Sequence, residues 1–112
     1  MILSHRFNDE EKARVWCFHN WCANCQSNIG VAGHHIYGAR GEHNNSILNC
    51  IFLCSACHLK ADSENTHQTG SPLRQKYLAM ALRQVIKSGH IFNDTDKKFL
   101  ESVKADVDVV LR

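Results

Sequence analysis

The chain has 112 residues, a formal net charge of +2 and a hydrophobic content of 44%, which predict one globular domain over 1–112 and argue against a disordered chain. We expect no membrane association, because no run approaches the roughly 18 consecutive apolar residues of a spanning helix. The opening segment MILSHRFNDEEK has no apolar core, so we expect no secretory signal and predict a cytoplasmic location. In that compartment six cysteines favour metal binding over disulfide bonds.

The first predicted element is a helix over about 9–18. Asn8 is a suitable N-cap, and Glu11 stands three residues later, where its side chain can reach back to the cap. We expect this helix to turn Trp16 and Phe18 toward a core.

The centre of the chain, about 22–62, is rich in cysteine and histidine. Its apolar pieces at 31–36 and 51–53 are short, which favours strands over helices, and the polar stretch between them is typical of a loop. A helix is predicted to start near Ser55.

A helical extension is predicted over about 72–111. Pro72 suits the first turn of a helix that ends before Gly89, and Asn93 or Thr95 can cap a last helix. The last helix carries apolar residues at helical spacing: Phe99, Leu100, Val103, Val107 and Leu111. These two helices can pack on the centre of the chain or on a second subunit.

Two matched C-x2-C pairs stand in the centre. They are Cys22 with Cys25, and Cys54 with Cys57. Each pair can present two thiolates to one point, and two pairs complete the tetrahedral sphere that zinc prefers, so we predict a closed zinc site that supports folding. Buried unpaired cysteines or a redox pair are the alternatives. Cys17 and Cys50 are expected to be small core side chains, although exchange of either into the zinc site stays open.

The histidines suggest a second site. An imidazole can act as a base near neutral pH, and one divalent cation held by side chains can stabilise negative charge. His58 and Asp62 are four residues apart and share a helix face, and His34 comes from the first strand, so the three can hold one cation. His35 points differently from its neighbour His34. The other histidines match no pattern and are expected at the surface: His5, His19, His43, His67 and His90.

Written as C-x2-C…HHI…N-x3-LC-x2-CH, the stretch from Cys22 to Asp62 resembles the HNH endonuclease family, in the branch with a four-cysteine zinc. The resemblance implies an α+β fold: a ββα-metal core at about 22–62, one N-terminal helix and two C-terminal helices. It implies that His35 is the general base, that His34 and His58 are cation ligands and that Asn49 hydrogen-bonds across the loop to hold the base. Asp62 is included as a ligand by analogy with members that have histidine there.

Four residues are predicted to bind nucleic acid. Lys76, Arg83 and Lys87 form a stripe on the helix that also contains Arg74 and no acidic residue, and such a stripe can track phosphates. A solvated helix face is the alternative. Arg40 can hold a phosphate in two hydrogen bonds, or it can pair with Glu42.

The predicted function is a metal-dependent endonuclease that hydrolyses duplex DNA with little sequence specificity. It would use structural Zn²⁺ and one catalytic divalent cation (Mg²⁺, Mn²⁺, Ni²⁺ or Zn²⁺) and, by resemblance, leave 5′-phosphate and 3′-hydroxyl ends. Small stand-alone proteins of this kind resemble phage or prophage proteins, and a homodimer or a phage or host protein is a candidate partner. A non-catalytic zinc-knuckle binding module and an RNA-directed nuclease are the alternatives.

Overall fold

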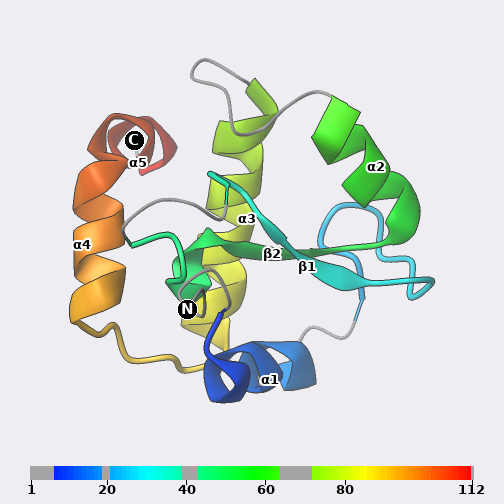
Figure 1. Cartoon of the computed structure of the whole chain (residues 1–112), viewed down its shortest axis with the longest axis horizontal. Helices are drawn as coiled ribbons and strands as arrows, with labels where there is room; N and C mark the ends of the chain where they lie inside the picture. Colours follow the sequence, from blue (N-terminus) through cyan, green and yellow to red (C-terminus); the bar gives the residue numbers. More distant parts are fainter. Residues whose placement is uncertain (1–6, 19–20, 39–42, 64–71, 112) are drawn as a thin grey trace, which may run out of the picture.

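The computed structural model describes residues 7–18, 21–38, 43–63 and 72–111. Figure 1 shows their arrangement as a mixed α/β fold with five helices and a two-stranded antiparallel sheet. The elements are α1 (Asp9–Phe18), β1 (Ala32–His35), a 3-10 turn (Ile47–Asn49), β2 (Cys50–Leu53), α2 (Ser55–Ser63), α3 (Pro72–Lys87), α4 (Asp94–Ser102) and α5 (Lys104–Val110). No helix in the described ranges is long and apolar enough to cross a membrane.

The helix ends follow the local signals of the sequence. The Asn8 side chain accepts a hydrogen bond of 3.1 Å from the backbone N–H of Glu11, which confirms the N-cap of α1. Gly89 follows α3 with a φ of 79°, which suits the residue after a helix end. Asn93 caps α4 in a capping box with Asp96.

The expectation of two C-terminal helices was wrong, because the described extension has three: α3, α4 and α5. The last predicted helix breaks at Val103, which leaves the helical conformation with φ −115° and ψ 27°. The break turns α5 so that Asp106 is buried and bonded to Arg74 on α3. Apolar spacing alone predicted one continuous helix and gave no sign of this tertiary contact.

The sheet separates two parts of the core. In the register of β1 with β2, His34 lies opposite Ile51 and His35 opposite Cys50. Because alternate strand residues face opposite sides of a sheet, Cys50 joins the apolar cluster that contains Phe52, and Ile51 joins the cluster beside the cysteines. All four residues of β2 are buried.

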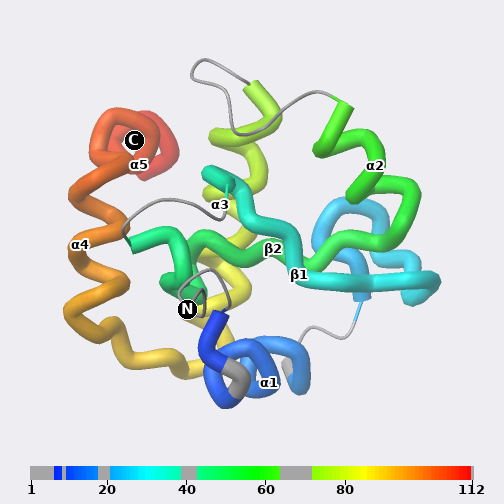
Figure 2. The backbone as a smooth tube through the Cα atoms, in the orientation of Figure 1, coloured from blue at the N-terminus to red at the C-terminus, as the bar shows by residue number. Residues whose placement is uncertain are grey.

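Helix α3 supports both clusters. Figure 2 shows it passing behind the sheet, with α1 below the sheet and α2 above its right-hand part. Tyr77 and Ala81 pack in the cluster beside the cysteines, and Leu78, Leu82 and Val85 pack in the cluster with Phe52. These five residues form the buried face of α3.

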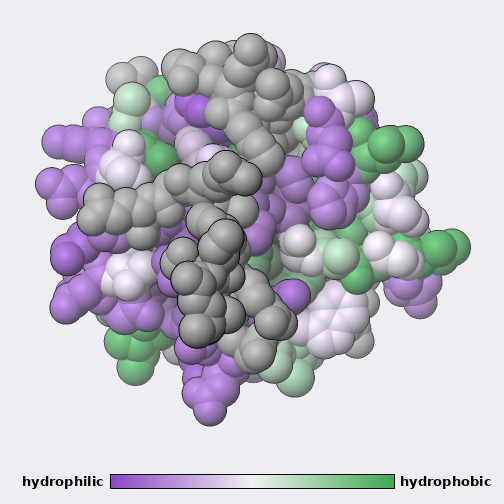
Figure 3. All heavy atoms as spheres, in the orientation of Figure 1, coloured by the Kyte–Doolittle hydropathy of each residue, from purple (hydrophilic) through white to green (hydrophobic). Residues whose placement is uncertain are grey.

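The surface in Figure 3 is hydrophilic over α4, and hydrophobic residues gather at the opposite edge, beside α2 and the segment before β1. Ile29 and Leu59 in these two segments are 73% and 71% exposed.

A buried polar cluster around Asp106 fastens α5 to the rest of the fold. Its carboxylate accepts hydrogen bonds from Tyr37 at 2.8 Å and from Gln75 at 2.9 Å, and it pairs with Arg74 at 3.1 Å. The Arg74 guanidinium also lies 4.7 Å from the centre of the Tyr37 ring. Burial raises the pKa of Asp106, but these hydrogen bonds and the Arg74 charge outweigh burial and hold the pKa below its usual value.

We predict that Asp106→Asn lowers the free energy of unfolding at neutral pH by about 1.5–3 kcal/mol, the usual value for a hydrogen bond to a charged group. Because the pKa of Asp106 is lowered by folding, its contribution is present above the unfolded pKa of about 4 and is lost as the pH falls through the lower folded value. The Tm difference between wild type and variant should therefore shrink in acid. Asp108→Asn on the same helix is the control: Asp108 is exposed, and its variant should lie within about 0.5 kcal/mol of wild type. A constant difference down to pH 2 would contradict the assignment.

Candidate metal centre and active site

The two C-x2-C turns bring four sulfurs together. The Sγ atoms of Cys22, Cys25, Cys54 and Cys57 all lie within 4.8 Å of one another, and those of Cys25 and Cys54 are 3.5 Å apart. A tetrahedral zinc with Zn–S bonds of about 2.3 Å spaces its sulfurs about 3.8 Å apart. The four thiols fit zinc in number, type and spacing, so this group could hold a metal such as zinc.

Local structure explains how each turn presents its sulfurs. The first turn is closed by a 2.9 Å hydrogen bond from the backbone N–H of Gln26 to the carbonyl of Cys22. The second lies where α2 begins: the backbone N–H of Cys57 donates to Cys54 Sγ at 3.5 Å, as to an N-cap side chain, and that of His58 donates to the Cys54 carbonyl. The positive end of the helix therefore faces the Cys54 sulfur.

The thiol pKa values differ within the group. Burial raises the pKa of Cys22, but hydrogen bonds from backbone groups of both turns outweigh it and lower the pKa to about 6. The Asn24 amide lowers the pKa of Cys57, but burial and the other three sulfurs outweigh it and raise the pKa to about 12. The four sulfurs therefore do not all ionise at neutral pH by themselves, and binding of a cation would release protons.

The two remaining cysteines behave differently from each other. Cys50 is buried, as expected, and burial raises the pKa of its thiol to about 12. Cys17 is exposed, so the expectation that it is a core side chain was wrong. It lies near the end of α1, where Val15 is buried and Trp16 packs against the core.

A second group lies between β1 and α2. His34, His58 and Asp62 each offer a ligand atom within 4.8 Å of the others. The ring centres of His34 and His58 are 4.9 Å apart and the rings are nearly perpendicular. His34 is 3% exposed and Asp62 is at the surface. Two imidazoles and one carboxylate could hold a divalent cation and leave coordination positions for water or a substrate oxygen.

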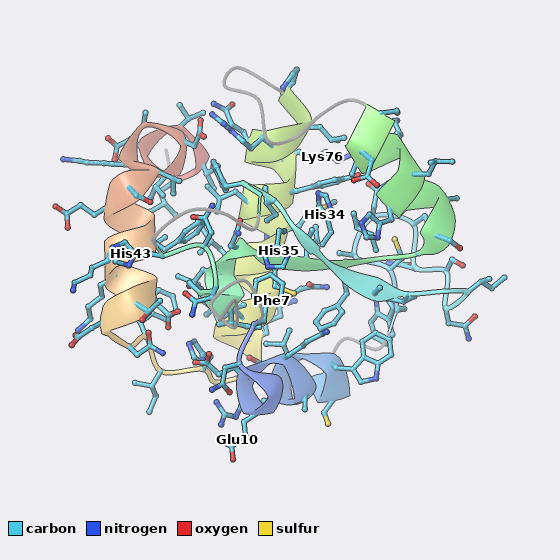
Figure 4. All side chains as sticks on the ribbon, viewed as in Figure 1. Phe7, Glu10, His34, His35, His43 and Lys76 are labelled. Carbon is cyan, nitrogen blue, oxygen red and sulfur yellow. The ribbon has the colours of Figure 1, made fainter. Side chains whose placement is uncertain are left out.

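The structure places His35 apart from this group. Figure 4 shows His34 between β1 and α2, whereas His35 lies over Phe7. The His35 and Phe7 rings stack with centres 4.0 Å apart and an angle of 14° between them. The Nε2 atom of His35 is buried. The two neighbouring histidines thus point to opposite faces of the strand, as expected.

Asn49 is fully buried and holds the turn that follows β1. Its side-chain oxygen accepts a hydrogen bond of 2.8 Å from the backbone N–H of Tyr37, and its amide donates to the carbonyls of Gly38 and Asn44 at 3.2 and 2.9 Å. Its own carbonyl accepts from the N–H of Ile36. Asn49 therefore hydrogen-bonds across the loop and fixes the chain directly after His35.

A third group was missed by the sequence analysis. His90, expected at the surface, is buried, and its Nε2 lies 2.6 Å from Asp96 and 3.5 Å from Glu11. The other oxygen of Asp96 accepts from Ser46 at 2.6 Å. These contacts tie α1 and α4 to the 3-10 turn, and the Asp96 oxygens are already engaged, so we interpret this group as structural. The only local signal was the capping box of Asn93 and Asp96.

The remaining predicted surface histidines and nucleic-acid-binding residues are only partly covered by the described residues. His43 is half-buried, and His5, His19 and His67 lie outside the described residues. Arg40 and Glu42 also lie outside the described residues. On α3, the stripe residues Lys76, Arg83 and Lys87 are exposed, whereas Arg74 is buried in its pair with Asp106.

Comparison with known proteins found no match for the chain among family models, curated proteins or solved structures.

We predict that the protein binds about one zinc ion per chain and that Cys25→Ser loses it. Because Cys25 is exposed, this change removes a ligand with little loss of packing, so a lower Tm would report the lost metal. Loss of the metal should cost a few kcal/mol of stability. In a domain near this size, each kcal/mol lowers the Tm by roughly 4–8 °C. Elemental analysis and thermal unfolding measure both effects.

Cys17→Ser is the matched control, because Cys17 is also exposed but lies outside the four-thiol group. It should keep the zinc and the Tm of wild type. Equal zinc content in both variants, or none in the native protein, would refute the zinc assignment.

Proposed function

We propose that the protein is a metal-dependent endonuclease of the HNH type that hydrolyses DNA. The proposal is carried by one observation: His34, His58 and Asp62 converge within 4.8 Å on the face of β1 that is turned to α2. Two strands followed by a helix, β1, β2 and α2, hold this group, which is the order of a ββα-metal core. A divalent cation there would take the charge of a phosphate and stabilise the leaving oxygen.

Each neighbouring residue then has a role in the proposed reaction. His35 is the general base that takes the proton of the attacking water. Asn49 positions the strand end that carries His35, through its bonds to Tyr37, Gly38 and Asn44. The thiol group holds the start of α2, and therefore His58, beside β1.

The exposed stripe on α3 would bind the DNA backbone. The stripe follows helical spacing: Arg83 comes seven residues after Lys76, and Lys87 comes four residues after Arg83. The three side chains therefore share one face of the helix. Figure 4 shows Lys76 on the side of α3 that is turned to α2. Contacts of this kind give affinity that depends on salt and little on sequence.

The stacking of His35 on Phe7 favours a second candidate function, a zinc-stapled nucleic-acid-binding module without catalysis. A ring held against Phe7 with a buried Nε2 is also what a structural histidine would show. For His35 to act as the general base, its imidazole must contact a water molecule next to the cation.

A nicking assay separates the two functions. Supercoiled plasmid is incubated with wild type, His35→Ala, His58→Ala or Asp62→Asn in Mg²⁺, Mn²⁺, Ni²⁺ or Zn²⁺, and the zinc content and Tm of each variant are recorded. We predict nicking by wild type and a loss of at least a hundredfold in His35→Ala, the usual range for a lost general base. His58→Ala should need a higher metal concentration. His43→Ala, outside the group, is the histidine control and should cut as wild type does.

Two results would contradict the proposed catalysis by His35. One is DNA retardation without cleavage in every metal, which favours the binding module. The other is nicking that is equal in wild type and His35→Ala, which would assign the cleavage to a contaminant or to another base. An RNA substrate run in parallel tests the remaining alternative.

A further inference from the structure

A pocket of about 330 Å³ lies between the segment before β1 and the second half of α3. Its lining consists of Trp21, Ala23, Gln26, Met80, Arg83, Gln84 and Lys87. The four residues from α3 stand at spacings of three and four, so one face of the helix forms a wall. A volume near this value is the lower end of the range for small-molecule pockets.

The lining combines a flat aromatic ring with positive charge. Trp21 is 41% exposed, so part of its indole is open to a ligand. Arg83 and Lys87 are exposed on the same wall, and none of the lining residues is acidic. The pocket therefore suits a ligand with a flat apolar face and one or more negative groups.

Gln84 gives an independent indication of a ligand. Gln84 is one of the lining residues and is only 8% exposed, and its Oε1 atom is buried and accepts no hydrogen bond from the described residues. A buried acceptor without a donor costs about 1–3 kcal/mol. A bound group with an N–H would remove that cost once the Gln84 amide turns its oxygen toward the pocket.

We propose that this pocket binds an unpaired nucleotide of single-stranded nucleic acid. The base stacks on Trp21 and donates an N–H to Gln84, and the flanking phosphates bind Arg83 and Lys87. A duplex does not fit this chemistry, because its base faces are stacked and its base edges paired. The choice of nucleic acid as the partner rests on the proposed function, and the inference narrows its substrate to DNA or RNA with an unpaired segment.

Tryptophan fluorescence reports on the pocket directly. The chain has two tryptophans, and Trp16→Phe leaves Trp21 as the single one; Trp16 packs against Phe52, a contact that phenylalanine can keep. This variant, combined with His35→Ala to prevent cleavage, is titrated with oligothymidylate, oligouridylate, a blunt-ended duplex of two annealed strands without a loop, and free thymidine monophosphate. We expect both single strands to quench Trp21, and the duplex and the free nucleotide to do so at much higher concentration or not at all.

Affinity is then measured by anisotropy of labelled oligothymidylate with single variants. Trp21→Ala should weaken binding at least fivefold, the lower end of base stacking on an aromatic ring. Lys87→Ala should weaken it and flatten its salt dependence, and Lys98→Ala, an exposed lysine on α4, is the charge-matched control that should change little. Gln84→Met should weaken binding without lowering the Tm, because it removes a buried acceptor that has no donor in the free protein.

The outcomes separate this inference from the proposed function. Quenching of Trp21 by single strands, with no cleavage of plasmid or of single-stranded DNA or RNA by wild type, would support the pocket and reject the nuclease. Nicking by wild type with unchanged affinity in Trp21→Ala would support the nuclease and overturn the pocket. Equal quenching by the duplex would overturn the single-strand preference, and equal quenching by thymidine monophosphate would mean that the ligand is a free nucleotide.

Discussion

In the antiparallel pairing of β1 with β2, His34 lies opposite Ile51 and His35 opposite Cys50. Side chains of paired residues share a face, so this register sends the first imidazole to α2 and the second to Phe7. Slippage by one residue would exchange them. The register is held at both ends: the Asn49 carbonyl accepts from the N–H of Ile36, and beyond the other end the N–H of Ser55 donates to the Ile29 carbonyl. The N–H of Ala23 also donates to the Phe52 carbonyl, which joins the first thiol turn to β2. The candidate cation group and the thiol group therefore depend on the same ladder.

Features with a local physical cause were predictable from the sequence. A cap such as Asn8 and a helix end such as Gly89 act within one turn of the chain, and the structure has both where the sequence placed them. The two C-x2-C turns were also predictable, because their spacing brings two sulfurs together whatever surrounds them. The grouping of His34 with α2 followed from strand alternation and from helical spacing on the next element.

Features decided by distant contacts were not predictable. The break at Val103 accompanies the burial of Asp106 against Arg74 and Tyr37, which are far away in sequence. Burial of His90 depends on Asp96 and Glu11, and no spacing rule connects α1 with α4. The stacking of Phe7 on His35 belongs to the same class. For this reason the prediction of one continuous last helix and the prediction that His90 lies at the surface were both wrong. The pocket beside Trp21 was not predictable either, because its walls come from two segments that are far apart in the sequence.

The buried thiol of Cys50 can report on the opening of the sheet. Its sulfur lies in the core beside Gly33, where a Cβ atom would come within 3.0 Å of it, and burial raises the pKa of the thiol to about 12. Alkylating reagents attack the thiolate, so this sulfur is protected for as long as the two strands stay paired. Its modification rate in the native protein therefore reports how readily the sheet opens: carbamidomethylation of Cys50, followed over time by mass spectrometry, would measure it.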